Sequence, residues 1–199
     1  MSTVTSDVVY DRGLDFFTAV VERMSPGDWQ RPSPCEGWRA LDVLGHIGAA
    51  TSMGTAILRG DPVEMSWPEP PGESVAGDPA GWWSALQGPA HQALQGADLD
   101  AVVDSPNGPR PVREGLAFPA VDLFVHAWDI ARSAKQAEDI EIPDDVIDFT
   151  YEVTGSVPED LLRSSNVFGP AVTPPADASR SEELLAWTGR DPAATPPLK

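Results

Sequence analysis

The 199-residue sequence predicts an all-α protein, built as an antiparallel four-helix bundle with extra short helices at its C-terminal end. Four stretches of roughly 16–20 residues carry apolar side chains at helical spacing. Segments rich in proline and glycine separate these stretches, and no convincing run of strands interrupts them. A chain of this length is sufficient for one domain with a full core, so the four stretches are expected to share it.

The first two helices are delimited by capping and stop residues. The first is expected to begin at Ser6 or Asp7, whose side chains accept hydrogen bonds from free backbone N–H groups, and to end before residues 25–28. The second is expected over residues 39–59. Its apolar stripe includes His46, which is therefore expected to point into the bundle. The alternative for this residue is a core histidine whose ring is hydrogen-bonded to a carbonyl oxygen and has no functional role.

A long loop separates the third and fourth helices from the second. Residues 61–77 are rich in proline, glycine and glutamate and are expected to form this loop as a flap over a pocket. The third helix follows over residues 79–95, where Pro89 should kink or break it. A short extended excursion around an Asn-Gly turn then leads to the fourth helix, over residues 115–134.

The remaining helices are short and are expected to pack outside the bundle. They cover residues 143–156 and 158–164, and a last helix begins with a capping box at Ser179. We therefore expect residues 1–140 to form the helical bundle and residues 141–199 to form an extension packed on the same domain.

Composition and charge exclude several classes of function. The chain has 31 acidic and 13 basic residues, a formal net charge of −18, which disfavours nucleic-acid and membrane partners. A single cysteine, Cys35, excludes an intramolecular disulfide and a cysteine-rich zinc module. The N-terminus lacks the features of a signal peptide, and no apolar run has the length of a membrane span. These features predict a cytoplasmic protein, and they leave open whether it is a monomer or a homodimer.

The fourth helix carries a pair of residues suited to metal binding. Asp122 and His126 lie four positions apart, so their Cβ atoms are about 5–6 Å apart on one face and can reach a single ion. The surrounding residues are apolar, and a buried carboxylate needs a positive partner or a metal. An ion-paired couple without metal is the alternative. Of the other two histidines, His46 is a candidate third ligand, whereas His91 lies among glutamines and is assigned no metal role.

Four segments of the sequence resemble the mycothiol-dependent maleylpyruvate isomerase family, which is part of the DinB-like metal-binding superfamily. The last two are similar to the C-terminal pieces of an actinobacterial subgroup of that family. In chain order, the four segments are Pro34–Trp38 with Leu41–His46, His126–Arg132, Phe168–Val172 and Thr188–Pro192.

The resemblance implies a DinB-like bundle in which His46, Asp122 and His126 bind a divalent metal. Zinc is the expected metal, and nickel and iron are alternatives because the same ligands suit them. The family pattern has glutamate where this chain has Asp122, which is one methylene shorter. Asp129 is a candidate to orient a metal ligand, and a salt bridge with Arg132 or a surface charge is the alternative.

The resemblance also implies mycothiol as a thiol co-substrate, whose metal-bound thiolate attacks a small electrophile for isomerisation or S-transfer. Trp67, Trp82 and Trp83 are candidates to line the cavity. Cys35 is expected to be inert packing, and a role as a nucleophile is the alternative. A metal-dependent hydrolase that uses metal-bound hydroxide is one alternative function. A non-catalytic protein that binds a metal or a small molecule is the other.

Overall fold

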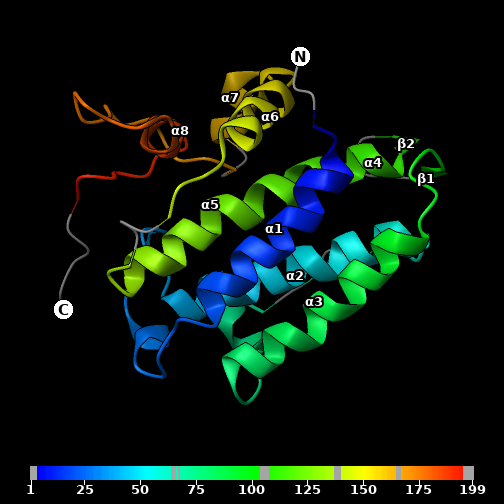
Figure 1. Ribbon diagram of the computed structural model, residues 1–199, viewed down its shortest axis with the longest axis horizontal. Helices are drawn as coiled ribbons and strands as arrows, with labels where there is room; N and C mark the ends of the chain where they lie inside the picture. Colours follow the sequence, from blue (N-terminus) through cyan, green and yellow to red (C-terminus); the bar gives the residue numbers. More distant parts are fainter. Residues whose placement is uncertain are drawn as a thin grey trace.

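Four long helices form the body of the molecule, as the sequence predicts (Figure 1). The computed structural model describes residues 4–63, 66, 68–103, 108–136, 140–164 and 167–194. The four helices are α1 (Ser6–Val21), α2 (Ala40–Arg59), α3 (Pro79–Gly96) and α5 (Ala117–Ser133). Helices α1 and α5 run in one direction and α2 and α3 in the other, and each of α1 and α2 packs against both α3 and α5.

The core between these helices consists of the apolar stripes that the helical spacing predicts. On α1, Leu14 and Phe17 are fully buried, and α5 approaches the helix closely at Gly13. A Cβ atom at Gly13 would lie 3.0 Å from Leu123, so a small residue is needed there. Helix α2 is the one helix in the described residues long and apolar enough to cross a membrane, and 50% of that stretch is buried inside the molecule.

The predicted loop between α2 and α3 is anchored to α2 instead of standing free. It contains a 3-10 helix, η2 (Pro71–Ser74). The backbone N–H of Gly72 donates to Oδ1 of Asp42 at 3.2 Å. A Cβ atom at Gly45 would lie 2.2 Å from the carbonyl oxygen of Pro71, so only glycine permits this contact. The loop is therefore fixed on α2 one residue before His46.

Two local predictions in the middle of the chain have different outcomes. Pro89 was predicted to kink or break the helix; the break is wrong, because α3 continues through this residue, and the kink stays a prediction. The carbonyl that loses its partner belongs to Ala85, which is exposed, so water can bond to it instead. The extended excursion is confirmed as a hairpin of β1 (Val102–Val103) and β2 (Arg110–Pro111), although Asn107 of the predicted turn lies outside the described residues.

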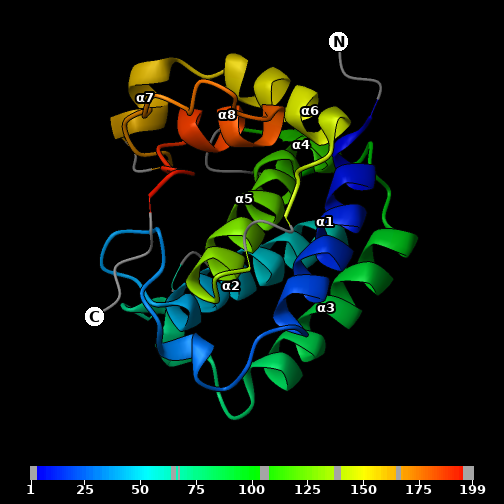
Figure 2. The same cartoon turned by 60° about the vertical axis from the view of Figure 1, so that its left-hand side comes forward.

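Shorter elements complete the chain. A 3-10 helix, η1 (Asp28–Gln30), lies in the loop before α2, and one turn of helix, α4 (Val112–Gly115), precedes α5. The C-terminal extension contains α6 (Asp144–Gly155), α7 (Glu159–Ser164) and α8 (Arg180–Trp187). Helix α6 packs against α8 and α5, so the extension covers one side of the bundle (Figure 2).

Candidate metal centre

Two of the predicted site residues face each other across the bundle. His46 projects from α2 and Asp122 from α5, and their Nε2 and Oδ2 atoms are 3.8 Å apart. Each side chain is 26% exposed, so this contact is open to solvent on one side. The Trp38 ring packs against His46 with a centroid distance of 5.4 Å. His46 therefore faces a carboxylate in the site, which the alternative of a buried core histidine did not predict.

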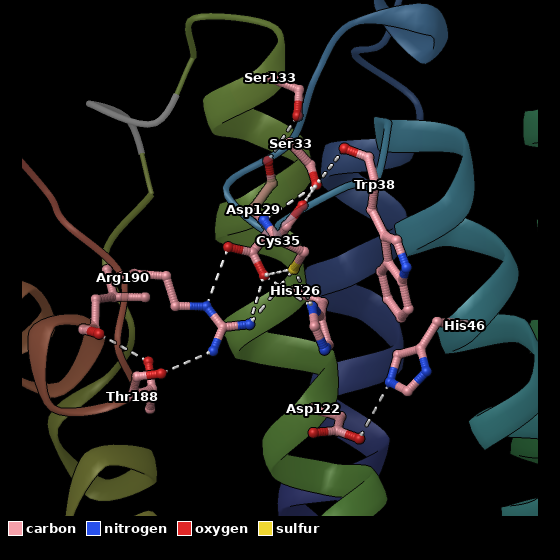
Figure 3. Close-up of polar contacts among 11 residues, drawn as sticks. Ser33, Cys35, Trp38, His46, Asp122, His126, Asp129, Ser133, Thr188 and Arg190 are labelled. Atoms are coloured by element: carbon pink, nitrogen blue, oxygen red, sulfur yellow. Dashed lines mark hydrogen bonds and ion pairs between the residues drawn. The ribbon is translucent and has the colours of Figure 1, made fainter. Parts of the chain in front are cut away.

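His126 lies beside this pair, and one edge of its ring is held by a carboxylate. The ring centroids of His126 and His46 are 5.0 Å apart. Nδ1 of His126 lies 2.8 Å from Oδ2 of Asp129, one turn further along α5. An ionised carboxylate only accepts hydrogen bonds, so Nδ1 carries the proton and Nε2 of the neutral ring keeps its lone pair. In Figure 3 the other ring edge points toward the space between His46 and Asp122.

Asp129 is fully buried and accepts hydrogen bonds from three side chains. Besides His126, the Arg190 guanidinium donates from Nη2 to Oδ2 at 2.8 Å and from Nε to Oδ1 at 3.2 Å. The Cys35 thiol donates to Oδ2 at 3.3 Å. Asp129 therefore pairs with Arg190, whereas Arg132 lies over the Trp128 ring and donates to backbone carbonyls.

The charges around Asp129 are balanced at neutral pH. Burial raises the pKa of Asp129, but the charge of Arg190 and the hydrogen bond from His126 outweigh burial and hold the pKa well below its usual range. Burial lowers the pKa of His126 despite its bond to Asp129, so the ring is neutral. Burial and the Asp129 charge raise the pKa of the Cys35 thiol, which stays protonated.

Asp122 is also ionised, and its ion-pair contact within the described part of the chain is with His46. Burial raises its pKa, while the contact with His46 and the electrostatic effects of the neighbouring His126 and Arg190 side chains together lower it by more. Its nearest partner is therefore an imidazole. This arrangement of two imidazoles and a partly exposed carboxylate suits a divalent cation, because each residue offers one donor atom and the carboxylate lacks a full counter-charge.

A second group of residues could also offer ligand atoms. Atoms of Cys35, His126 and Asp129 lie within 4.8 Å of one another. However, Asp129 already has Arg190 as its cation, and its lone pairs accept four donor atoms. A metal ion there would be repelled by the guanidinium, whose Nη2 is 3.8 Å from the Cys35 sulfur. Cys35, His126 and Asp129 are therefore already engaged with one another and with Arg190.

Arg190 is the site residue that the sequence reasoning missed. It follows α8, where Gly189 adopts a left-handed conformation with φ of 90° and packs closely on Gly169. The guanidinium also donates to the carbonyl of Thr188 at 3.2 Å. The signal for Arg190 was the family-like segment Thr188–Pro192, which gave no indication of what it contacts. Cys35, expected as inert packing, contacts Asp129 from the loop before α2.

The remaining candidates lie away from the centre or outside the described residues. Trp83 is buried in the bundle core, where its indole donates to Thr18 at 2.8 Å, so its prediction as a cavity wall is wrong. It faces α1 because its position on α3 lies on the stripe toward that helix. Trp82 packs against α2, and Trp67 lies outside the described residues. His91 pairs with acidic residues of α1.

Comparisons with known proteins agree with this architecture. Residues 10–131, more than half of the chain, match a family model described as the mycothiol maleylpyruvate isomerase N-terminal domain. Uncharacterized proteins of two Mycobacterium tuberculosis strains are each 22% identical over 185 residues, which is 92% of this chain and 96% of theirs.

Two solved structures have a similar fold. The crystal structure of the mycothiol-dependent maleylpyruvate isomerase aligns with a TM-score of 0.57 and 15% identity, over 72% of this chain and 65% of that one. A His-to-Ala variant of it aligns with the same TM-score and coverage at 14% identity. The aligned region spans less than two thirds of the isomerase chain, and at this identity the likeness concerns the fold.

Proposed function

The chain belongs to the mycothiol maleylpyruvate isomerase N-terminal domain family, and from this premise we propose that it binds a divalent metal and acts as a mycothiol-dependent isomerase or S-transferase on a small electrophile. The observation that carries the proposal is the meeting of His46 and Asp122, which lie 3.8 Å apart, with the ring of His126. Two helices far apart in the sequence contribute these three side chains.

The proposed ligands are His46, Asp122 and His126. Zinc is the proposed metal, with nickel and iron as alternatives on the same donor set. A bound divalent cation would lower the pKa of a coordinated thiol and so make a thiolate available near neutral pH. The part of the chain around these ligands leaves His46 and Asp122 each 26% exposed, so a co-substrate can approach them from that side.

The other side chains of the centre hold the ligands in place. Asp129 fixes the ring of His126 through its bond to Nδ1, and Trp38 packs against the ring of His46. Asp122 is one methylene shorter than the glutamate of the family pattern. The shorter side chain would change how the carboxylate reaches a bound ion, through a closer position of the ion or a bridging water, or it would weaken the affinity.

The cysteine of this chain supports an external thiol as the nucleophile. Cys35 is the single cysteine in the sequence, and its thiol donates to Asp129. Its raised pKa keeps it protonated at neutral pH, and the thiol is a poor nucleophile. A thiolate used in the reaction would thus come from a co-substrate such as mycothiol. A cytoplasmic monomer or homodimer without nucleic-acid or membrane partners remains part of this proposal.

Metal content and thiol-dependent turnover test the proposal. Mass spectrometry should find about one metal ion per chain in the wild type and much less in His46→Ala and His126→Ala, with helix content retained by circular dichroism. His91→Ala is the matched control, because this histidine pairs with Asp11 and Asp15 away from the centre, and it should keep the metal. Unchanged metal in both ligand variants would contradict the ligand assignment.

Turnover then separates the functions. Mycothiol with maleylpyruvate or chlorodinitrobenzene should give product, and a chelator should abolish it. Metal-dependent cleavage of an ester or amide without added thiol would indicate a hydrolase instead. Stoichiometric metal without any turnover would indicate a binding protein.

A further inference from the structure

We propose that Arg190 is a positioning residue for His126, so that the C-terminal extension determines whether the metal centre is correctly assembled. The inference rests on the proposed function, because it concerns the orientation of one proposed ligand. It assigns a role in the centre to a side chain that lies 61 residues beyond Asp129 in the sequence.

A continuous chain of short contacts runs from Arg190 through Asp129 to His126. Two nitrogens of the guanidinium bond to the two oxygens of Asp129, at 2.8 Å and 3.2 Å, and this two-point contact fixes the plane of the carboxylate. Oδ2 of the same carboxylate lies 2.8 Å from Nδ1 of His126. The Asp129 side chain is fully buried and those of Arg190 and His126 are 10% exposed, so water competes little for these contacts.

The contact with Asp129 determines which nitrogen of the His126 ring carries the proton. The fixed carboxylate keeps the proton on Nδ1, and the lone pair stays on Nε2 at the edge that faces His46 and Asp122. A histidine with its proton on Nε2 would present an N–H group to that space and could not bind a cation through it. A carboxylate that is free to rotate, or that loses its charge, removes this constraint.

The C-terminal extension anchors Arg190 beside Asp129. Its backbone follows the left-handed turn at Gly189, and its guanidinium also donates to the carbonyl of Thr188. Nearby, Arg132 of α5 donates to the carbonyl of Pro192 at 2.9 Å, so the segment after α8 is bonded to α5 at two points. Arg190 thus reaches Asp129 only when this segment is docked on the bundle.

The test compares Arg190→Gln with Arg180→Gln, which removes a different arginine of the same extension. Arg180 pairs with Asp144 and Asp148, away from the centre. Nitrogen-15 NMR of the histidine rings in the metal-free protein should show His126 protonated on Nδ1 in the wild type and in Arg180→Gln. In Arg190→Gln the Nε2-protonated form should appear, and Zn²⁺ affinity measured by titration should fall about 10- to 100-fold.

Two further variants keep the test decisive. Arg190→Lys retains a cation and should recover part of the Zn²⁺ affinity, which loss of packing alone would not explain. If Arg190→Gln does not fold, Gly189→Ala strains the turn that carries Arg190 while leaving both charges in place, and the Nε2-protonated form of His126 should then appear in part. An unchanged His126 tautomer and unchanged Zn²⁺ affinity in the folded variant would overturn the proposal.

The experiment distinguishes failure of the Arg190 proposal from failure of the proposed metal centre. A wild type that binds no Zn²⁺ contradicts the metal centre, while the tautomer in the metal-free protein still tests the role of Arg190. If the wild type binds Zn²⁺ and Arg190→Gln shows the same affinity and the same His126 tautomer, only the role of Arg190 is contradicted.

Discussion

The two edges of the His126 ring lie in two different environments. At the Nδ1 edge, Asp129, Arg190 and Cys35 form a closed cluster in which the carboxylate has its counter-charge and its hydrogen bonds. At the other edge, His46 and Asp122 are partly exposed, and among the described residues the carboxylate of Asp122 pairs with an imidazole instead of a guanidinium. The closed side therefore holds the ring, whereas the open side presents the side chains that we propose as metal ligands.

This difference predicts which changes affect folding and which affect binding. A buried ion pair adds little net stability, but removal of one partner leaves a buried charge without compensation. A partly exposed carboxylate is still hydrated when its partner is lost, so the fold tolerates the change better. Removal of a charge on the closed side should lower stability and should affect metal affinity only through the orientation of His126. Substitutions on the open side should lower metal affinity with little effect on stability.

The largest expected effect on stability is that of Arg190→Gln. It leaves the Asp129 carboxylate buried without its cation, so the free energy of unfolding should fall by about 3–5 kcal/mol in urea titrations. Arg180→Gln removes exposed ion pairs and should cost less than about 1 kcal/mol. Equal losses in both variants would mean that the closed side has no special part in the fold.

Asp122→Asn should have its main effect on metal affinity. The amide keeps the shape of the side chain but lacks the charge, so Zn²⁺ affinity by calorimetric titration should fall about 100-fold or more. Because Asp122 is 26% exposed, the unfolding free energy of the metal-free protein should change by about 1 kcal/mol or less. A large loss of metal-free stability would place Asp122 with the closed side instead.

Gly189→Ala should have an intermediate effect on stability. Its φ of 90° is costly for a residue with a side chain, and an added Cβ atom would lie 2.9 Å from Gly169. We expect a loss of about 1–3 kcal/mol in thermal or urea unfolding. Gly88→Ala is the control, since it lies in α3 with nothing near the added atom and should be neutral or stabilising by up to about 1 kcal/mol.

Cys35→Ser should have the smallest effect. The hydroxyl can donate to Asp129 as the thiol does, so stability should change by less than about 1 kcal/mol and metal content should not change. Mass spectrometry of the purified variant measures this directly. Loss of metal would identify Cys35, His126 and Asp129 as the ligands and would reverse the assignment of the two sides.

The sequence predicted the open side better than the closed side, for a physical reason. Asp122 and His126 are four residues apart in one helix, and helical geometry alone places them together. His46 lies on the apolar stripe of α2, which must face the bundle interior. Helical periodicity thus brought all three near one another, and the family resemblance joined them into one proposed ligand set.

The closed side could not be predicted in this way. Arg190 and Cys35 come from irregular segments at opposite ends of the chain, and no periodicity relates either residue to Asp129. The tertiary docking of the C-terminal extension determines their position. The predicted break at Pro89 was wrong because it also depended on tertiary structure. The rule that proline breaks a helix does not consider that Ala85, whose carbonyl loses its partner, is exposed to water.

The position of Arg190 in the sequence has a consequence for biosynthesis. A ribosome makes the chain from its N-terminus, so His46, Asp122 and His126 leave the exit tunnel before Arg190 is released. A nascent chain that has emerged only as far as α5 presents all three imidazole and carboxylate groups, while Asp129 still lacks its counter-charge. We therefore expect ribosome-bound chains that lack the segment after α8 to capture little of the proposed metal.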